Sequence, residues 1–205
     1  MKLLALQCPH CASSLTPDEH DVVIACPNCK SAVLLEEGGL RLVDDHVAAP
    51  SHKNPQAWLP FWGFDGQVNV QSREAQNNKI SLNRWISTYD SQSFWNRASR
   101  FFVPAWDIDL PQASELTRSL LESQPTFQRI DRPDTAIFQP AVIRPEDAQK
   151  LLELAIVTFE AARRDWLKKL DFSLEMSSPV FWVLPAEQKK GRWQLLAKST
   201  RRYPQ

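Results

Sequence analysis

Four cysteines are the residues of this sequence best suited to chemistry, and all of them lie within the first 29 residues. Cys8 and Cys11 form one Cys-X-X-Cys pair, Cys26 and Cys29 form a second, and fourteen residues separate the pairs. Each pair can point two thiolates at one ion from a tight turn, and two such turns complete a tetrahedron. The spacing therefore predicts one Zn²⁺ ion with a structural role, since four protein ligands leave no open position for catalysis.

Two other uses of these cysteines stay open at this point. A disulfide or a redox motif needs the same pairs, but cysteines confined to one end, with no βαβ pattern around them, favour a metal in a reducing compartment. Iron is the other alternative, because Cys-Pro-X-Cys turns also occur in rubredoxins. Those turns usually carry glycine after the second cysteine, whereas Ala12 and Lys30 stand there in this chain. We therefore expect zinc and a cytoplasmic protein.

Residues 1–47 resemble the zinc ribbons of transcription factors, RNA polymerase subunits and many bacterial proteins. The resemblance rests on the four cysteines and implies that they are the metal ligands. Together with the apolar stretch at 59–62, it makes the whole chain look like bacterial zinc-ribbon proteins of uncharacterised function, and this likeness implies no activity.

The charge of the chain argues against a general affinity for nucleic acid. Lysine plus arginine and aspartate plus glutamate number 24 each. Residues 1–50 carry three basic and seven acidic side chains, a net charge of −4, which zinc bound to four thiolates makes about −6. A phosphate backbone would be repelled by such a surface. We expect the ribbon to be a folding module or a docking surface for another protein.

The C-terminal end is the one strongly basic part of the chain. Residues 186–205 have a net charge of +5, and the aromatic residues Trp193 and Tyr203 lie among the cations. This composition suits a surface that stacks bases and contacts phosphates. A nucleic-acid-associated protein is therefore one alternative function, with possible anion contacts at Lys189, Lys190, Arg192, Trp193, Lys198, Arg201 and Arg202.

An enzyme is the other alternative. Asp65, Asp107 and Asp109 follow two tryptophan-containing stretches, and carboxylates brought together can transfer protons or bind a cation. Residues of this kind more often end strands and cap turns. No phosphate loop, dinucleotide fingerprint or zinc-protease motif occurs in the sequence.

The elements that must position these residues divide the chain into three parts. Short β-type runs at 22–25, 32–35 and 40–43 belong to the zinc ribbon at 1–47, together with a run at 3–6. Two prolines mark a linker at 48–55. Residues 56–205 form a tryptophan-rich domain, with eight tryptophans in the whole chain.

The tryptophan-rich domain should be a mainly antiparallel β structure with one long amphipathic helix. Strand patterns occur at 58–65, 68–70, 80–82 with 85–86, and 101–109, and a hairpin is expected at 180–184 and 193–197. A short helix is expected at 112–123. Apolar residues at three- and four-residue steps predict the long helix at 145–171, with Pro145 at its first position. The fold class is therefore α+β.

The preferred function is a non-enzymatic protein-interaction or adaptor module, in which zinc holds the ribbon together. No run of residues is long and apolar enough to span a membrane. The expected partner is another protein, whose identity the sequence does not reveal.

Overall fold

The computed structural model describes residues 6–51, 54–75, 91–133, 138–163 and 166–201. Its elements are β1 (Val23–Ala25), β2 (Ala32–Glu36), β3 (Gly39–Val43), β4 (Asp45–Ala48), β5 (Ala57–Ala75), β6 (Ser99–Pro104), α2 (Leu110–Ser123), β7 (Pro125–Phe127), β8 (Arg129–Ile130), α3 (Pro145–Ala161), β9 (Leu167–Met176), β10 (Val180–Lys189), β11 (Arg192–Leu195) and β12 (Ser199–Arg201). The strands expected at 80–82 and 85–86, and most of the one expected at 3–6, lie outside the described residues.

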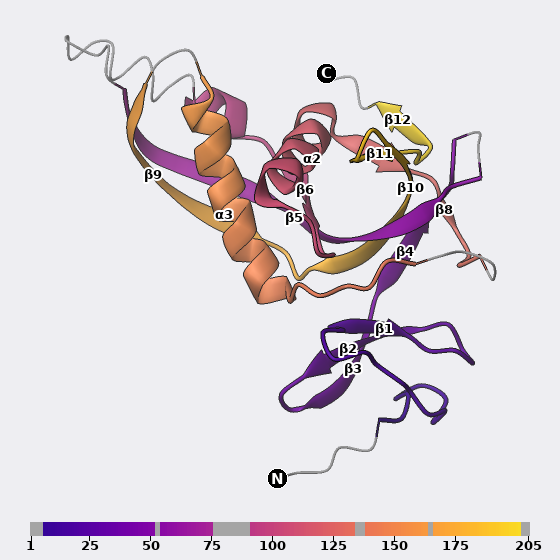
Figure 1. Cartoon of the computed structure of the whole chain (residues 1–205). Coiled ribbons are helices and arrows are strands. Elements are labelled where there is room, and N and C mark those ends of the chain that lie inside the picture. Colours follow the sequence, from indigo (N-terminus) through magenta and orange to yellow (C-terminus); the bar gives the residue numbers. More distant parts are fainter. Residues whose placement is uncertain (1–5, 52–53, 76–90, 134–137, 164–165, 202–205) are drawn as a thin grey trace.

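The N-terminal strands form a small sheet of their own. β1, β2 and β3 pair antiparallel in this order, and β2 and β3 are joined by a tight turn at 37–38. The β-type runs expected at 32–35 and 40–43 are therefore the two strands of one hairpin. This sheet lies at one end of the molecule, with the N-terminal turns beyond it (Figure 1).

The large sheet is built around the 19-residue strand β5. The first half of β5 pairs antiparallel with β10 on one side and with β6 on the other. Its second half pairs antiparallel with β9, which precedes β10 in the chain. The strand order is β6-β5-β10-β4-β8, with β11 added to β10. Among the strands that the structure describes in this sheet, the β4–β10 pair is the parallel one. The expected mixed structure with mainly antiparallel strands is therefore confirmed.

The centre of this sheet is buried on both faces. Along β5, Trp58, Trp62 and Phe64 join the core cluster on one face, and Leu59 and Phe61 join a second cluster on the other. Strands buried on both faces are continuous apolar runs rather than alternating ones. This is why 57–64 shows no polar position, whereas the second half of β5 alternates between buried and more exposed residues.

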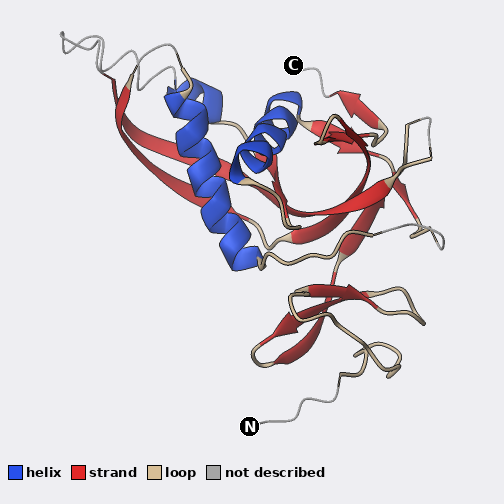
Figure 2. Cartoon of the chain, viewed as in Figure 1, coloured by secondary structure: helices blue, strands red, loops and turns tan. Residues whose placement is uncertain are grey.

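Helix α2 follows its prediction and is capped at both ends. The Asp109 carboxylate accepts a hydrogen bond from the Gln112 backbone N–H at 2.9 Å, as an N-cap does. Gln124 ends the helix in the left-handed conformation, and its side-chain oxygen accepts from the Arg100 N–H of β6 at 2.9 Å. Figure 2 shows α2 and α3 next to each other against the curved sheet.

The long helix expected at 145–171 is wrong in its C-terminal part. α3 has 17 residues and ends at Ala161, and 167–176 is a strand. The reason is that this segment also alternates, so a sheet can use the apolar residues that a helix would use. Its even-numbered apolar side chains pack on the core beside β5, namely Leu170, Phe172, Leu174 and Met176.

The boundary between ribbon and second domain also differs from the expectation. β4, at 45–48, is a strand of the large sheet, where Trp182 of β10 is opposite His46. Ala48 and Ala49, expected to begin an exposed linker, are buried. The chain passes from the small sheet into the large one without a solvated spacer, because β4 is needed to cover the edge of β10.

Candidate metal centre

The first cysteine pair lies on a tight turn closed by two backbone hydrogen bonds. The Cys8 N–H donates to the Ser13 carbonyl at 2.8 Å, and the Ala12 N–H donates to the Cys8 carbonyl at 2.8 Å. Ala12 has a φ of 60°, a left-handed conformation that glycine usually supplies. The turn brings the Cys8 and Cys11 side chains to the same place.

The second pair repeats this geometry. The Cys26 N–H donates to the Ser31 carbonyl at 2.9 Å, the Lys30 N–H donates to the Cys26 carbonyl at 3.0 Å, and Lys30 has a φ of 64°. The two residues that replace the rubredoxin-type glycines therefore adopt the conformation that glycine would adopt. Ala12 and Lys30 are therefore compatible with the turn that rubredoxins form with glycine.

The four sulfur atoms converge on one point. All four Sγ atoms lie within 4.8 Å of one another, with Cys8 and Cys29 at 3.6 Å and Cys11 and Cys26 at 3.5 Å. Zn–S bonds of about 2.3 Å in a tetrahedron place sulfurs about 3.8 Å apart. The sulfur cage thus has the size that one metal ion needs. Among the described residues, these cysteines are the only group of three or more potential ligands at such distances.

The surroundings of the thiols favour ionisation at two of the four positions. The Ser13 hydroxyl, 3.4 Å from the Cys11 sulfur, and the Ser13 backbone lower the pKa of Cys11 to about 7. Ser31 acts in the same way and lowers the pKa of Cys29 to about 5. Burial raises the pKa of Cys8 to about 11. A metal must ionise that last thiol itself, as metal–thiolate bonds do.

A small apolar cluster surrounds the sulfur atoms. Cys8 and Cys26 are buried beside Leu15 and Val33, with Leu40 packed against them. Val33 and Leu34 are neighbours on β2 and face opposite ways, so Val33 contacts the cysteine cluster and Leu34 contacts the main core. The small sheet therefore lies between the cysteines and the large sheet.

The basic C-terminal residues are spread along a hairpin rather than gathered into one site. Lys189 pairs with Glu187 at 2.7 Å, and Arg192 pairs with Glu115 of α2 at 3.1 Å. Lys190 lies at the exposed hairpin turn and Lys198 is exposed beyond it. The Arg201 side chain and Arg202 lie outside the described part of the chain.

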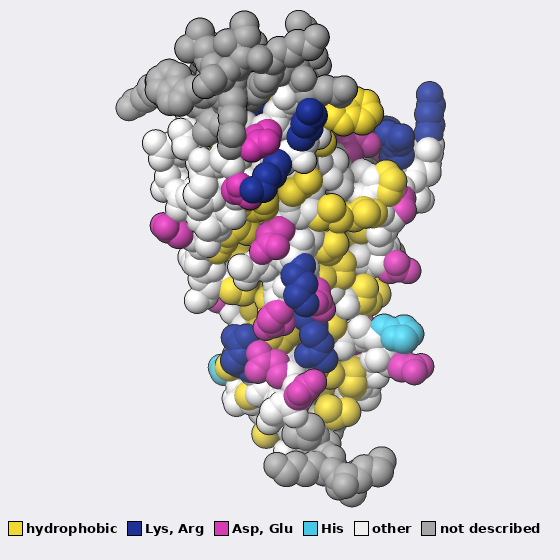
Figure 3. Space-filling view, turned by 90° about the vertical axis from the view of Figure 1, so that its left-hand side faces the viewer, with side chains coloured by type: hydrophobic (Ala, Val, Ile, Leu, Met, Phe, Trp, Pro, Cys, Tyr) yellow, Lys and Arg dark blue, Asp and Glu magenta, His cyan; other side chains and the backbone are white. Residues whose placement is uncertain are grey.

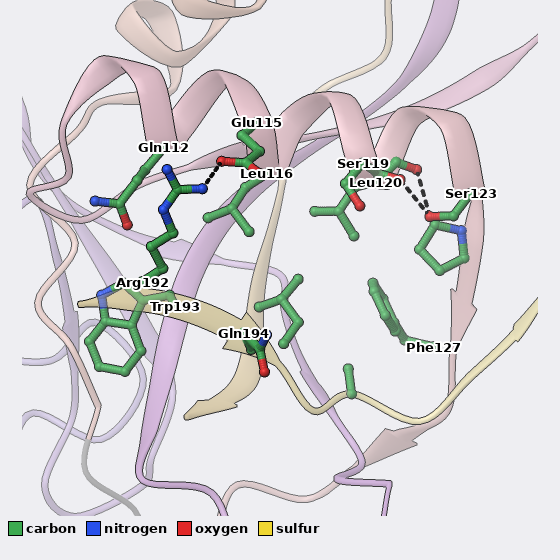
Figure 4. A pocket seen from close by; sticks show the side chains of 13 residues that line it. Gln112, Glu115, Leu116, Ser119, Leu120, Ser123, Phe127, Arg192, Trp193 and Gln194 are labelled. Carbon is green, nitrogen blue, oxygen red and sulfur yellow. Dashed lines mark hydrogen bonds and ion pairs between the residues drawn. The ribbon is translucent and has the colours of Figure 1, made fainter. Parts of the chain in front are cut away.

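Arg192 and Trp193 border a groove of about 500 Å³ between α2 and the C-terminal strands (Figure 4). Leu116, Leu120 and Phe127 contribute apolar surface to it, and the Glu115–Arg192 ion pair lies on its rim. The hydrogen-bonding groups are mainly neutral amides and hydroxyls. This composition suits a neutral, partly apolar group better than a phosphate.

The three aspartates are not brought together. Asp65 accepts two hydrogen bonds from the guanidinium of Arg100, both at 2.6 Å, and this raises the pKa of Arg100. Asp109 caps α2. Asp65 is opposite Arg100, whereas Asp107 follows the other end of β6, so about 13 Å of strand lies between them.

A buried polar cluster was missed by the sequence analysis. Glu160 of α3 accepts a hydrogen bond from Arg73 Nε at 2.7 Å and from Trp95 Nε1 at 2.7 Å, and Arg163 pairs with it at 2.9 Å. Arg73 and Trp95 are 87 and 65 positions from Glu160 in the chain, so no local pattern could reveal these two contacts. The cluster has no exposed carboxylate surface and connects α3 to β5.

Comparisons of the chain with protein-family models, with curated proteins and with solved structures found no significant match. None of the helices in the described ranges is long and apolar enough to cross a membrane. The function of the protein must therefore be inferred from the geometry of the cysteine cluster and its surroundings.

Proposed function

We propose that Cys8, Cys11, Cys26 and Cys29 bind one Zn²⁺ ion whose role is structural. The observation that carries this proposal is the convergence of four sulfur atoms within 4.8 Å from two matching turns. Zinc is preferred over iron because four thiolates in a closed tetrahedral site suit it and because it brings no redox chemistry to the site. The ion would join the two cysteine turns. Without it, the bridge between Gln7 and Ser14 closes only the first turn, and the β1–β2 pairing closes only the second.

The metal-bound module is proposed to act in a non-enzymatic interaction or adaptor protein. A closed ligand shell offers no position for a substrate, and the aspartates considered for acid–base chemistry lie apart. The acidic surface of the ribbon would attract a basic region of another protein. The ion pairs of Lys189 and Arg192 weigh against the nucleic-acid alternative, because paired cations release fewer counterions on binding phosphates.

Metal analysis of the purified full chain tests the first part of the proposal. We expect one zinc per chain by elemental mass spectrometry, and loss of that zinc in Cys26→Ser. Ser14→Ala, which changes an exposed residue of the same module, should retain it. Bound iron, or an intact mass showing two disulfides, would overturn the zinc assignment.

The interaction role needs a separate test. A partner captured by the native chain should bind again when both proteins are purified, and Glu19→Lys with Glu37→Lys should weaken that complex. Glu153→Lys on the exposed side of α3 reverses one carboxylate charge away from the ribbon and should leave the complex intact. Failure to rebuild any complex from purified proteins would contradict the adaptor role and leave the metal assignment unaffected.

A further inference from the structure

The outer edge of β9 is an open sheet edge. Among the described residues, this ten-residue strand pairs only with β5. The Ser177 N–H donates to the Asp65 carbonyl at 2.7 Å, which fixes the alternation of the backbone groups. Glu175 and Ser173 then point their N–H and C=O groups at β5, and Leu174 and Phe172 point theirs outward. The unpaired N–H and C=O groups of an edge this long are a template on which another strand can pair.

The side chains of β9 also indicate that a neighbouring strand is missing. Leu170, Phe172, Leu174 and Met176 all pack on the main core, yet each of them is only half-buried. Trp166, just before the strand, is 73% exposed. Figure 3 views the molecule from the side on which α3 and β9 lie, and apolar side chains are seen there beside charges of both signs. A strand added to β9 would cover the flank of the apolar row.

The charges on β9 match those of a second copy of the same strand. We propose that two copies of the chain form a symmetric dimer by antiparallel pairing of their β9 edges, centred on Phe172. This register places Lys169 opposite Glu175 of the second copy, twice per dimer by symmetry. Both side chains are exposed on the face of β9 away from the core. Opposite charges in cross-strand positions stabilise a sheet, and like charges destabilise it.

Moving the centre of the pair by one residue in either direction is disfavoured by the same charges. Centring the pair on Asp171 places the two Asp171 side chains opposite each other, and centring it on Ser173 places Asp171 opposite Glu175. The Phe172 register also directs outward-pointing backbone groups of both copies at each other. Leu170 then packs beside Leu174 of the second copy, and Trp166 lies along its 176–178 segment. The interface is small, so we expect dissociation in the micromolar range.

A charge exchange tests the proposal on the full chain loaded with zinc. Sedimentation equilibrium should show a monomer–dimer equilibrium in the native chain. Lys169→Glu should raise the dimer dissociation constant about tenfold or more, and so should Glu175→Lys, because each creates two like-charge pairs. The double variant Lys169→Glu/Glu175→Lys restores opposite charges and should return the constant to within about threefold of the native value.

Glu153→Lys changes the charge by the same amount on an exposed residue of α3 and should leave the dissociation constant unchanged. Circular dichroism of each variant checks that the fold is retained, and the double variant keeps the test valid if one single variant folds poorly. A native chain that is monomeric up to about 300 µM, where even weak interfaces associate, would overturn the proposal. A dimer that is insensitive to both single variants would overturn it as well.

Discussion

Glu160 shows how one side chain can hold two elements together. Its carboxylate has no exposed surface and Arg73, on β5, is 1% exposed. A buried charge is tolerated only when its partners satisfy it, and here Arg73, Trp95 and Arg163 together do so. The cluster lies at the point where α3 ends and the chain turns toward β9. It therefore fixes the end of α3 against β5.

Replacing this carboxylate should be costly although the change in shape is small. Glu160→Gln keeps an acceptor for Trp95 but removes the negative charge that pairs with Arg73 Nε at 2.7 Å in the buried cluster. We expect a loss of about 3–5 kcal/mol in the free energy of unfolding. Urea unfolding followed by circular dichroism measures it. Glu153→Gln, an exposed carboxylate on the same helix, should change it by less than about 0.5 kcal/mol.

His46 makes the stability of the chain depend on pH. Its ring lies 4.9 Å from the ring of Trp182, and its side chain is 11% exposed. Burial, and then the positive charge of Arg129, lower the pKa of His46, against smaller opposing effects of Asp44 and Asp45. The folded protein therefore resists protonation of this ring more than the unfolded chain does.

The lowered pKa of His46 makes the folded state less stable at acidic pH. Above about pH 6.5 His46 is neutral in both states and costs nothing. As the pH falls below that value, the unfolded chain takes up a proton that the folded chain does not, so stability decreases. Unfolding free energies measured at about pH 7.5 and about pH 5 should differ less in His46→Gln than in the native chain. An equal benefit from His20→Gln, which changes an exposed histidine, would contradict this assignment.

At this scale the sequence predicted the cysteine cluster because its ligands come in two local pairs. Cys8 and Cys11 are positioned by one turn, and only the turn-to-turn distance depends on the rest of the fold. Glu160 and Arg73 are 87 positions apart, and nothing near either residue reveals the other. A buried ion pair of this kind becomes visible only when the sheet has been assembled.

At the scale of elements, the pairing of β5 with β10 depends on close packing between Gly63 and Trp182. A Cβ atom on Gly63 would lie 2.8 Å from Cδ1 and 3.1 Å from Nε1 of Trp182. That indole cannot move aside easily, since Arg100 and Arg129 lie over it at 5.8 and 5.4 Å. The glycine is needed here for space rather than for its backbone freedom.

Gly63→Ala should therefore destabilise the fold by about 1–3 kcal/mol, as overpacking does. Thermal unfolding monitored by circular dichroism would show this as a lower Tm. Gly38→Ala is the matched control, because a Cβ atom there meets nothing within 4 Å. If the two variants had the same Tm, the packing between Gly63 and Trp182 would be looser than the structure indicates.

Helices and strands were predictable where the apolar residues follow a single periodicity. Residues 112–123 form a helix as expected, and the final hairpin is found at β10 and β11. The segment after Ala161 carries both periods, because Trp166 and Leu170 extend the helical face while 170–176 alternates. Pairing with β5 decides between them, and that partner lies about 100 positions earlier in the chain.

At the scale of the whole molecule, the ribbon is part of one packed structure. Val23, Ala32 and Leu34 share a core cluster with Trp58 and Trp62. The segment before α3 connects the two parts, since the Ala141 carbonyl accepts from the Val22 N–H at 2.7 Å and the Ile143 carbonyl accepts from Trp62 Nε1 at 2.8 Å. Composition suggested a linker at 48–55 because prolines mark that segment. The packing of the N-terminal sheet on the large sheet was not predictable, because it depends on residues that are distant in sequence.

Loss of the proposed zinc ion should consequently affect more of the molecule than the N-terminal sheet. Structural zinc binding contributes on the order of 10 kcal/mol to small modules, so Cys26→Ser should open the small sheet. The amides of Val22 and Leu35 should then exchange faster with deuterium, and tryptophan emission should shift to longer wavelength as Trp58 and Trp62 lose cover. Amides of β6 and β10 should keep their protection from exchange, because both strands are hydrogen-bonded to β5. Unchanged emission in the metal-free variant would mean that the large sheet keeps its core closed without the ribbon.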